Sequence, residues 1–389
     1  MIPLQSKLPK VGTTIFTVMS QLAMEHGAVN LGQGFPDFAG PEALYDALAR
    51  HMRAGHNQYA PMMGIPKLRQ QIALKSERLY GSAVNPDTEV TVTSGATEAL
   101  FAAIAAIARA GDEVIVLDPC YDCYEPAIEL MGARAVHVPL DPQTFAIDYD
   151  RLAAAFSART RALMINSPGN PSGAVLLPAD LDRIAALLRE RDAYLISDEV
   201  YEHIIFDGVP HASVLGHPEL RARAFVISSF GKTYHVTGWK IGYCVAPPQL
   251  STEFRKVHQY LTFSSFTPAQ WALADVLESD PQHYLDLPSF YQGKRDYFRK
   301  ALKDAPFKLL PVGGAYFQLV DYSQLSDEDD ASFARTLTRE GKVASIPVSA
   351  FYETAPGTKI IRFCFAKREE TLDVAAAQLR AFAERRGVR

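Results

Sequence analysis

The chain has 389 residues, of which 48% are hydrophobic and 21% charged, a balance typical of a globular protein with a large core. Lys and Arg number 39 and Asp and Glu 44, so the formal net charge of −5 argues against a nucleic-acid-binding protein, which needs a basic surface. The sequence contains no run of about 18 apolar residues and no apolar secretory leader, so we expect no membrane partner and a cytoplasmic location.

Short apolar runs alternate with helical periodicity between residues 85 and 250. Strands are predicted over residues 89–93, 113–117, 161–166, 194–197, 224–229 and 241–246, and helices over residues 97–109 and 178–191. This alternation predicts a largely parallel sheet that helices cover on both faces. Ligands of such sheets bind beyond the carboxyl ends of the strands, so the residues at those ends are the candidate site.

The C-terminal part has a different pattern. A helix is predicted over residues 294–301, a turn and strand over 313–320, and a strand over 360–365. The acidic run 327–330 indicates the start of a helix, since carboxylates stabilise helix N-termini. Apolar residues at helical spacing predict a closing helix after residue 370, and the whole forms a second, smaller α/β unit.

Several segments match only part of a known binding motif. Residues 231–233 match the end of a phosphate loop, but Val226 stands where its first glycine is required. A GxG motif that begins like a dinucleotide fingerprint ends at Asp37 instead of glycine. Cys120 and Cys123 form a C-x-x-C, but no second cysteine pair or histidine cluster completes a zinc site, so no metal ligand is predicted.

Small or polar residues follow four of the predicted strands. They are Gly95, Ala96 and Thr97 at a helix start, Asn170 in the loop NSPGNPSG, Asp198 and Tyr201 in SDEVY, and Lys232. A helix start with small residues can hold a phosphate through its free N–H groups. The pattern therefore places a phosphate cradle, a carboxylate, a phenol, an amide and an amine at one edge of the sheet.

These segments resemble the class I aminotransferases, fold type I enzymes that use pyridoxal 5′-phosphate. The resemblance is carried by residues 228–242 (SSFGKTYHVTGWKIG), by NSPGNPSG and SDEVY, and by the arginine segment IRFCFA at residues 361–366. It extends from residues 15–16 and NLGQGFPDF at 30–38 to the C-terminal helix, and it is greatest for bacterial methionine aminotransferases, then for kynurenine aminotransferase/glutamine transaminase K.

The resemblance implies a mostly parallel seven-stranded sheet in a large domain with a smaller α/β domain beside it. Residues 1–45 would form an N-terminal arm and part of the small domain, residues 46–285 the large cofactor-binding domain, and residues 286–389 the rest of the small domain. The active unit would be a homodimer with shared active sites.

The resemblance also implies a role for each site residue. Lys232 would bond to the cofactor and carry the substrate proton, Asp198 would face the pyridine nitrogen, and Tyr201 and Asn170 would donate to the phenolic oxygen. Tyr121 would stack on the ring. The phosphate would be held by Gly95, Ala96, Thr97, Ser229, Lys240 (often arginine in the family) and Tyr59 of the neighbouring subunit. Arg362, Gly34 and Asn170 would bind the substrate carboxylate, and Phe16, Phe35 and, from the partner, Phe263 the side chain.

The stretch 260–268 offers aromatic residues and no arginine for a second carboxylate. An apolar pocket favours methionine and aromatic amino acids over aspartate as amino donors to a 2-oxo acid. The resemblance adds kynurenine or glutamine as donors and implies a ping-pong reaction. The alternative on the same fold is a cysteine-conjugate β-lyase, which would release pyruvate without a 2-oxo acid acceptor. A cofactor-sensing binding protein is a third possibility, and loss of cofactor binding without loss of function would support it.

Overall fold

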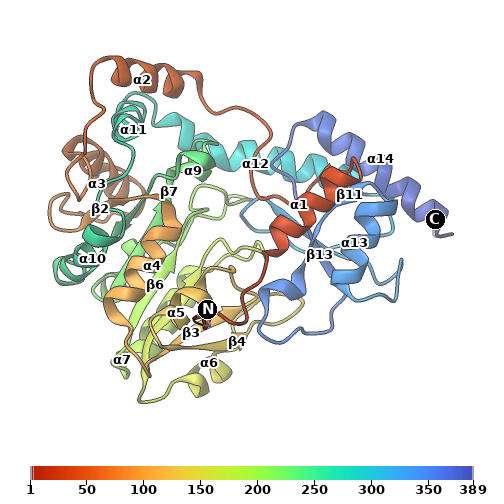
Figure 1. Cartoon of the computed structure of the whole chain (residues 1–389), viewed down its shortest axis with the longest axis horizontal. Helices are drawn as coiled ribbons and strands as arrows, with labels where there is room; N and C mark the ends of the chain where they lie inside the picture. The colour runs from red at the N-terminus through yellow and green to blue at the C-terminus, as the bar shows by residue number, and fades with distance from the viewer. Residues whose placement is uncertain (1, 3, 388–389) are drawn as a thin grey trace.

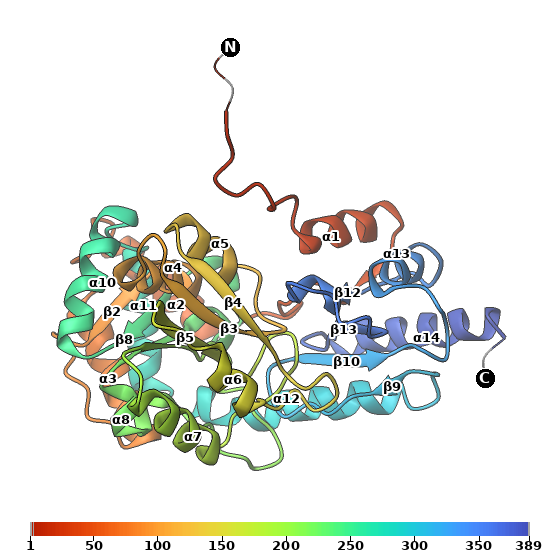
Figure 2. The same cartoon turned by 90° about the horizontal axis from the view of Figure 1, so that it is seen from below.

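The computed structural model describes residue 2 and residues 4–387, and it has two α/β parts (Figure 1). The long helix α12 (Gln282–Ala301) runs beneath both parts in the view of Figure 2. Within the residues that the structure describes, no helix combines the length and the hydropathy needed to cross a membrane.

The larger part is built on a seven-stranded sheet. In spatial order its strands are β2 (Val90–Thr93), β8 (Gly242–Val245), β7 (Ala224–Ser229), β6 (Tyr194–Asp198), β5 (Thr160–Asn166), β3 (Glu113–Asp118) and β4 (Arg134–Pro139). Strand β8 is antiparallel to both of its neighbours, and the other pairs are parallel. The expected seven-stranded, mostly parallel sheet is confirmed.

Helices cover both faces of this sheet (Figure 1). The helices of the larger part are α2 (Glu42–Arg53), α3 (Pro66–Tyr80), α4 (Gly95–Ile107), α5 (Tyr124–Leu130), α6 (Tyr149–Ala155), α7 (Pro178–Arg189), α8 (Pro218–Arg221), α9 (Phe230–Thr233), α10 (Pro248–Leu261) and α11 (Thr267–Ser279), with 3₁₀ helices η1 (Val214–Gly216) and η2 (Thr237–Trp239). Alternate residues of β7 enter opposite cores, Phe225 and Ile227 one and Val226 the other. A strand buried on both faces therefore has a continuous apolar sequence.

The smaller part contains an antiparallel sheet in the order β12 (Ile346–Pro347), β13 (Ile360–Cys364), β10 (Phe317–Asp321) and β9 (Lys308–Leu309). Its helices are α1 (Ile15–Glu25), α13 (Asp330–Glu340), α14 (Glu369–Arg385) and the 3₁₀ helix η3 (Val348–Phe351). Strand β1 (Val29–Asn30) pairs in parallel with β11 (Val343–Ala344), so the N-terminal segment packs within the C-terminal part.

Some predicted boundaries differ from the observed ones. Helix α4 begins at Gly95 rather than at residue 97, since Gly95 adopts a φ of +81° that turns the chain directly from β2 into the helix. The helix predicted over 294–301 is the end of α12, which continues through an internal Pro288. The acidic run does start a helix, with Asp329 accepting a hydrogen bond from the Ser332 N–H.

Candidate active site

A cavity of about 350 Å³ lies beyond the carboxyl ends of the central strands. Fourteen residues proposed from the sequence line it: Phe16, Gly34, Phe35, Gly95, Ala96, Thr97, Tyr121, Asn170, Asp198, Tyr201, Ser229, Lys232, Lys240 and Arg362. The fold thus gathers at one place groups that are far apart in the chain, and their chemical roles stay predictions.

One end of the cavity is a cradle at the start of α4. A Cβ on Gly95 would lie 3.2 Å from Lys240 Cε and 3.3 Å from Lys240 Nζ, so only glycine lets this ammonium lie against the helix start. A Cβ on Gly242 would lie 2.8 Å from the Ala96 N–H nitrogen. Backbone N–H groups, a helix dipole and a cation together fit a phosphate group.

A buried carboxylate–imidazole contact supports this cradle from behind. Glu98 Oε2 accepts a hydrogen bond from the Ser94 N–H at 3.1 Å, and its Oε1 lies 3.0 Å from His258 Nδ1. The other ring nitrogen of His258 lies 2.9 Å from the Met62 carbonyl oxygen. The fully buried ring thus contacts an oxygen atom with each nitrogen and links α10 to α4.

Asp198 ends β6 at the opposite end of the cavity. Its Oδ2 accepts a hydrogen bond from the Tyr124 hydroxyl at 2.6 Å, and its Oδ1 accepts from the Val200 N–H at 3.2 Å. Burial raises the pKa of Asp198 to about 6, against the lowering effect of the Tyr124 hydrogen bond. The Asn166 amide donates to the Asp198 carbonyl oxygen at 2.9 Å and holds the end of the strand.

Lys232, on the single turn of α9, projects into the cavity. Its Nζ donates to the Tyr316 hydroxyl at 2.9 Å and to the Gly34 carbonyl at 3.2 Å, and the same hydroxyl donates to Gly34 at 2.6 Å. Burial lowers the pKa of Lys232 to about 8. A larger fraction of this amine is therefore neutral near pH 7 than of an exposed lysine.

Arg362 comes from β13 of the smaller part and is completely buried. Its Nη1 donates to Asn170 Oδ1 at 2.6 Å and its Nη2 to the Gly32 carbonyl at 2.8 Å. The guanidinium carbon lies 4.0 Å from the ring centre of Phe317 and 5.3 Å from that of Phe16. Among the described residues, nothing bonds to its buried Nε, so this N–H is available to a carboxylate ligand.

Two of the proposed residues lie outside the cavity. The Tyr59 side chain is 83% exposed, and its ring centre lies 5.4 Å from that of Phe263. Both were expected to act on a neighbouring subunit, so this placement within one chain does not test them.

Sequence reasoning missed Tyr124, Tyr316, Asn166, Val200 and Phe317, which contact or flank the site residues. Asn166 opens the NSPGNPSG loop and Tyr124 follows Tyr121 in the same segment, so both had a local signal. Tyr316 had none, because its partner Lys232 is distant in the chain and the contact depends on how the two parts pack.

The comparisons with known proteins agree with this geometry. A family model described as "Aminotransferase class I and II" matches residues 26–379. The chain is 55% identical over 376 residues to methionine aminotransferase of Escherichia coli, covering 97% of each. A crystal structure from that organism, reported with a methionine aminotransferase function, superposes with a TM-score of 0.96 and covers 98% of this chain and 100% of the other.

Two further relatives are more distant. The chain is 40% identical to a probable N-succinyldiaminopimelate aminotransferase of Mycobacterium tuberculosis, covering 98% of each protein. It is 35% identical to human kynurenine–oxoglutarate transaminase 1, covering 92% of this chain and 93% of that one. The chain therefore belongs to the class I and II aminotransferases, enzymes that depend on pyridoxal 5′-phosphate.

Proposed function

We propose that this aminotransferase moves the α-amino group of methionine, and of aromatic amino acids, to a 2-oxo acid by a ping-pong mechanism. The observation that carries the proposal is one cavity with Lys232, Asp198 and Arg362 on its walls and phenylalanines between them. The identity to the Escherichia coli methionine enzyme supports the choice of methionine.

The cavity fits pyridoxal phosphate at both of its ends. The phosphate would lie at the start of α4, beside Lys240 and Ser229. Space is available there because Gly95 and Gly242 have no Cβ. Asp198, whose carboxylate is buried, would face the pyridine nitrogen, and Tyr121 the ring. When bound, the cofactor supplies an aldehyde that accepts the amino group and a ring that withdraws electrons from the substrate α-carbon.

The chain's own residues supply binding and proton transfer. Lys232 Nζ would take the proton from the α-carbon of the amino acid, because burial favours its neutral amine. In the half-reaction with the 2-oxo acid, the same amine would return a proton to the α-carbon. Tyr316 holds this amine in place at 2.9 Å. Arg362 would bind the α-carboxylate, with its guanidinium already oriented by Asn170 and Gly32.

The number of cations in the cavity favours a substrate with an apolar side chain. The cations that line the cavity within the described chain are Lys232, Lys240 and Arg362, and each has a proposed partner. None is left for a distal carboxylate, whereas Phe16 and Phe35 offer an apolar surface. We therefore expect a higher kcat/KM for methionine than for aspartate.

The test is the visible spectrum of the purified holoenzyme, with methionine added in the absence of a 2-oxo acid. Methionine should convert the visible band of the Lys232-bound cofactor into the near-ultraviolet band of the aminated form, and Lys232→Ala should not respond. A band that aspartate converts with higher kcat/KM than methionine would contradict the substrate assignment. Pyruvate released from a cysteine conjugate without an acceptor would favour the β-lyase instead.

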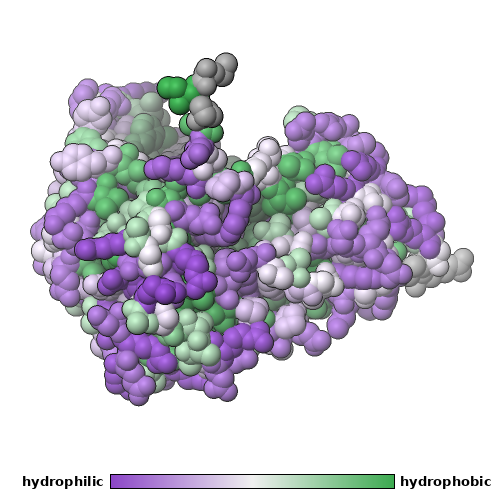
Figure 3. All heavy atoms as spheres, turned by 60° about the horizontal axis from the view of Figure 1, so that its bottom comes forward, coloured by the Kyte–Doolittle hydropathy of each residue, from purple (hydrophilic) through white to green (hydrophobic). Residues whose placement is uncertain are grey.

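We propose a homodimer in which Tyr59 and Phe263 complete the site of the partner. Tyr59 and Tyr260 are 83% and 92% exposed, an unusual exposure for large aromatic side chains. Within the described residues, the chain before α1 projects from the body in Figure 2, and in Figure 3 hydrophobic and hydrophilic residues are mixed on the face from which it leaves. Such an arm and such exposed aromatic side chains are suited to contact a second copy of the chain.

A hybrid dimer tests the sharing of sites. Lys232→Ala and Tyr59→Ala chains, each tagged differently, would be mixed by co-expression and the heterodimer purified. One site then contains both Lys232 and Tyr59, so the heterodimer should bind the cofactor more tightly than the Tyr59→Ala homodimer. Equal cofactor affinity in the two dimers would refute a shared site, and a monomer in analytical ultracentrifugation would refute the dimer.

We also propose the division into an arm and small-domain part at residues 1–45, a large domain at 46–285 and a small domain at 286–389. It is supported by the pairing of β1 with β11 and by the position of Arg362 opposite Lys232. A cytoplasmic location is proposed as well, and the four free cysteines are compatible with a reducing compartment.

A further inference from the structure

A second cluster of polar side chains lies at the edge of the large sheet, where β3 and β4 run in parallel. In this pairing His137 of β4 is opposite Val116 of β3, and Asp118 lies two positions further on the same face of β3. Cys120 follows in the loop after the strand. Local sequence patterns singled out Cys120 but not this cluster, because its members come from two strands and a loop.

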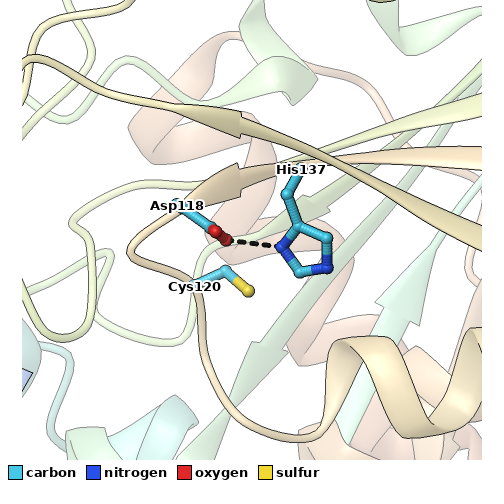
Figure 4. A group of neighbouring side chains, drawn as sticks. All are labelled: Asp118, Cys120 and His137. Atoms are coloured by element: carbon cyan, nitrogen blue, oxygen red, sulfur yellow. Dashed lines mark hydrogen bonds and ion pairs between the residues drawn. The ribbon is translucent and has the colours of Figure 1, made fainter. Parts of the chain in front are cut away.

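The three side chains present different metal-ligating atoms at short range. The donor atoms of Asp118, Cys120 and His137 all lie within 4.8 Å of one another, and His137 Nδ1 lies 2.8 Å from Asp118 Oδ1 (Figure 4). The imidazole and the carboxylate side chains are only 6% and 4% exposed. A carboxylate, a thiol and an imidazole at this spacing are a donor set that a metal ion could use.

The second ring nitrogen of His137 points to the same conclusion. Its Nε2 is buried and has no hydrogen-bond partner among the described residues, and the nearest carboxylate oxygen, Glu125 Oε2, is 3.9 Å away. If Nδ1 bound a metal, the ring proton would move to Nε2 and face Glu125. Metal-bound histidines commonly direct their other N–H to a carboxylate in this way.

The arrangement does not fit a nucleophilic cysteine. Such a cysteine needs a histidine beside its sulfur, with the carboxylate behind the ring. Here the ring nitrogen Nδ1 is engaged by Asp118, and Nε2 has no hydrogen-bond partner among the described residues. No thiol-to-imidazole hydrogen bond is therefore present to activate Cys120.

We propose that Asp118, Cys120 and His137 form a binding site for Zn²⁺, separate from the cofactor site. One thiolate, one imidazole and one carboxylate are the ligand types that Zn²⁺ takes in three-residue sites, with a fourth position for water. Cys120 also lines a second cavity, of about 390 Å³, from which that water would come. Binding releases the thiol proton to solvent.

The position of this site connects it to the active site. Asp118 Oδ2 accepts a hydrogen bond from the Glu353 N–H of the smaller part at 3.0 Å, and the Cys120 N–H donates to the Phe351 carbonyl at 2.9 Å. The next residue, Tyr121, lines the active-site cavity. A cation bound by Asp118 and Cys120 would therefore hold in place the loop that precedes Tyr121 and that contacts the smaller part.

The experiment is direct metal binding to the chelator-treated, dialysed holoenzyme. Titration calorimetry with Zn²⁺, checked by elemental analysis, should give one ion per chain, and binding should be at least about tenfold weaker in Cys120→Ser and His137→Gln. Cys123→Ser, which changes the neighbouring thiol outside the cluster, is the matched control and should bind as the parent does. The cofactor spectrum of each variant verifies its folding.

Substitution with Co²⁺ gives an independent readout. The parent should show intense ligand-field bands in the red, where the cofactor does not absorb, as expected for a four-coordinate site with a thiolate. Failure of the parent to bind one Zn²⁺ per chain would overturn the proposal. Equal Zn²⁺ affinity in the parent and in a folded Cys120→Ser would also overturn it, because the ion would then lie at the cofactor or the surface.

Discussion

The hydrogen bond from Tyr124 to Asp198 should set the acid limit of catalysis. The two side chains are buried, and the 2.6 Å bond favours the ionised carboxylate that a protonated pyridine nitrogen requires. Tyr124→Phe removes only the hydroxyl. A hydrogen bond to a charged group contributes about 1.5–3 kcal/mol, and about 1.4 kcal/mol corresponds to one pKa unit. The loss should therefore raise the pKa of Asp198, from about 6 in the parent, by about one to two units.

The assay is the pH profile of kcat/KM for methionine, together with a pH titration of the cofactor spectrum. Activity that depends on an ionised Asp198 falls as the pH drops through its pKa, so the acid limb of Tyr124→Phe should move to higher pH. Tyr297→Phe is the matched control, because Tyr297 makes a 2.7 Å hydrogen bond to Asp373 that is remote from the cavity. An acid limb at the same pH in Tyr124→Phe and in the parent would refute the reasoning.

Three further predictions test the other parts of the site. Arg362→Lys keeps the charge but loses the forked donor, and the kcat/KM for methionine should fall about 10- to 150-fold, mainly through KM; an unchanged KM would contradict carboxylate binding here. Gly242→Ala places a Cβ 2.8 Å from three backbone atoms, so fluorescence titration should show weaker cofactor binding, whereas Gly293→Ala, with nothing within 4 Å, should bind normally. His258→Ala removes the contacts of the buried ring with Glu98 and with the Met62 carbonyl, so urea denaturation should show a loss of about 1–3 kcal/mol of stability, and a loss under about 0.5 kcal/mol would refute the pairing.

The strands that could be predicted from the sequence are those buried on both faces of the sheet. Strands such as β7 are buried on both faces and have continuous apolar sequences that local patterns reveal. Strand β4 was missed because it lies at the sheet edge and its sequence is interrupted by Arg134 and His137. Strands β9, β11 and β12 have two residues each, too few for any periodicity to appear.

The site residues divide along a similar line. That Lys232 and Asp198 line one cavity was predictable because both follow strands, and the topology of a parallel sheet brings strand ends together. Tyr316 and His137 were missed because their partners, Lys232 and Asp118, are chosen by tertiary packing. Sequence reasoning therefore identified the residues expected to touch the cofactor better than those that orient them.

The surroundings of Arg362 explain why its position matters more than its charge. Burial between aromatic rings lowers the pKa of the guanidinium, and no acidic side chain is hydrogen-bonded to it within the described chain. The two donors it has engaged, to Asn170 and Gly32, bind it to the larger part and to the N-terminal segment at once. A substrate carboxylate would give this buried cation its missing countercharge without any need to reorient it. If Arg362 binds the α-carboxylate as proposed, its orientation is already provided by the folded protein, and binding depends on the smaller part holding Arg362 at the cavity.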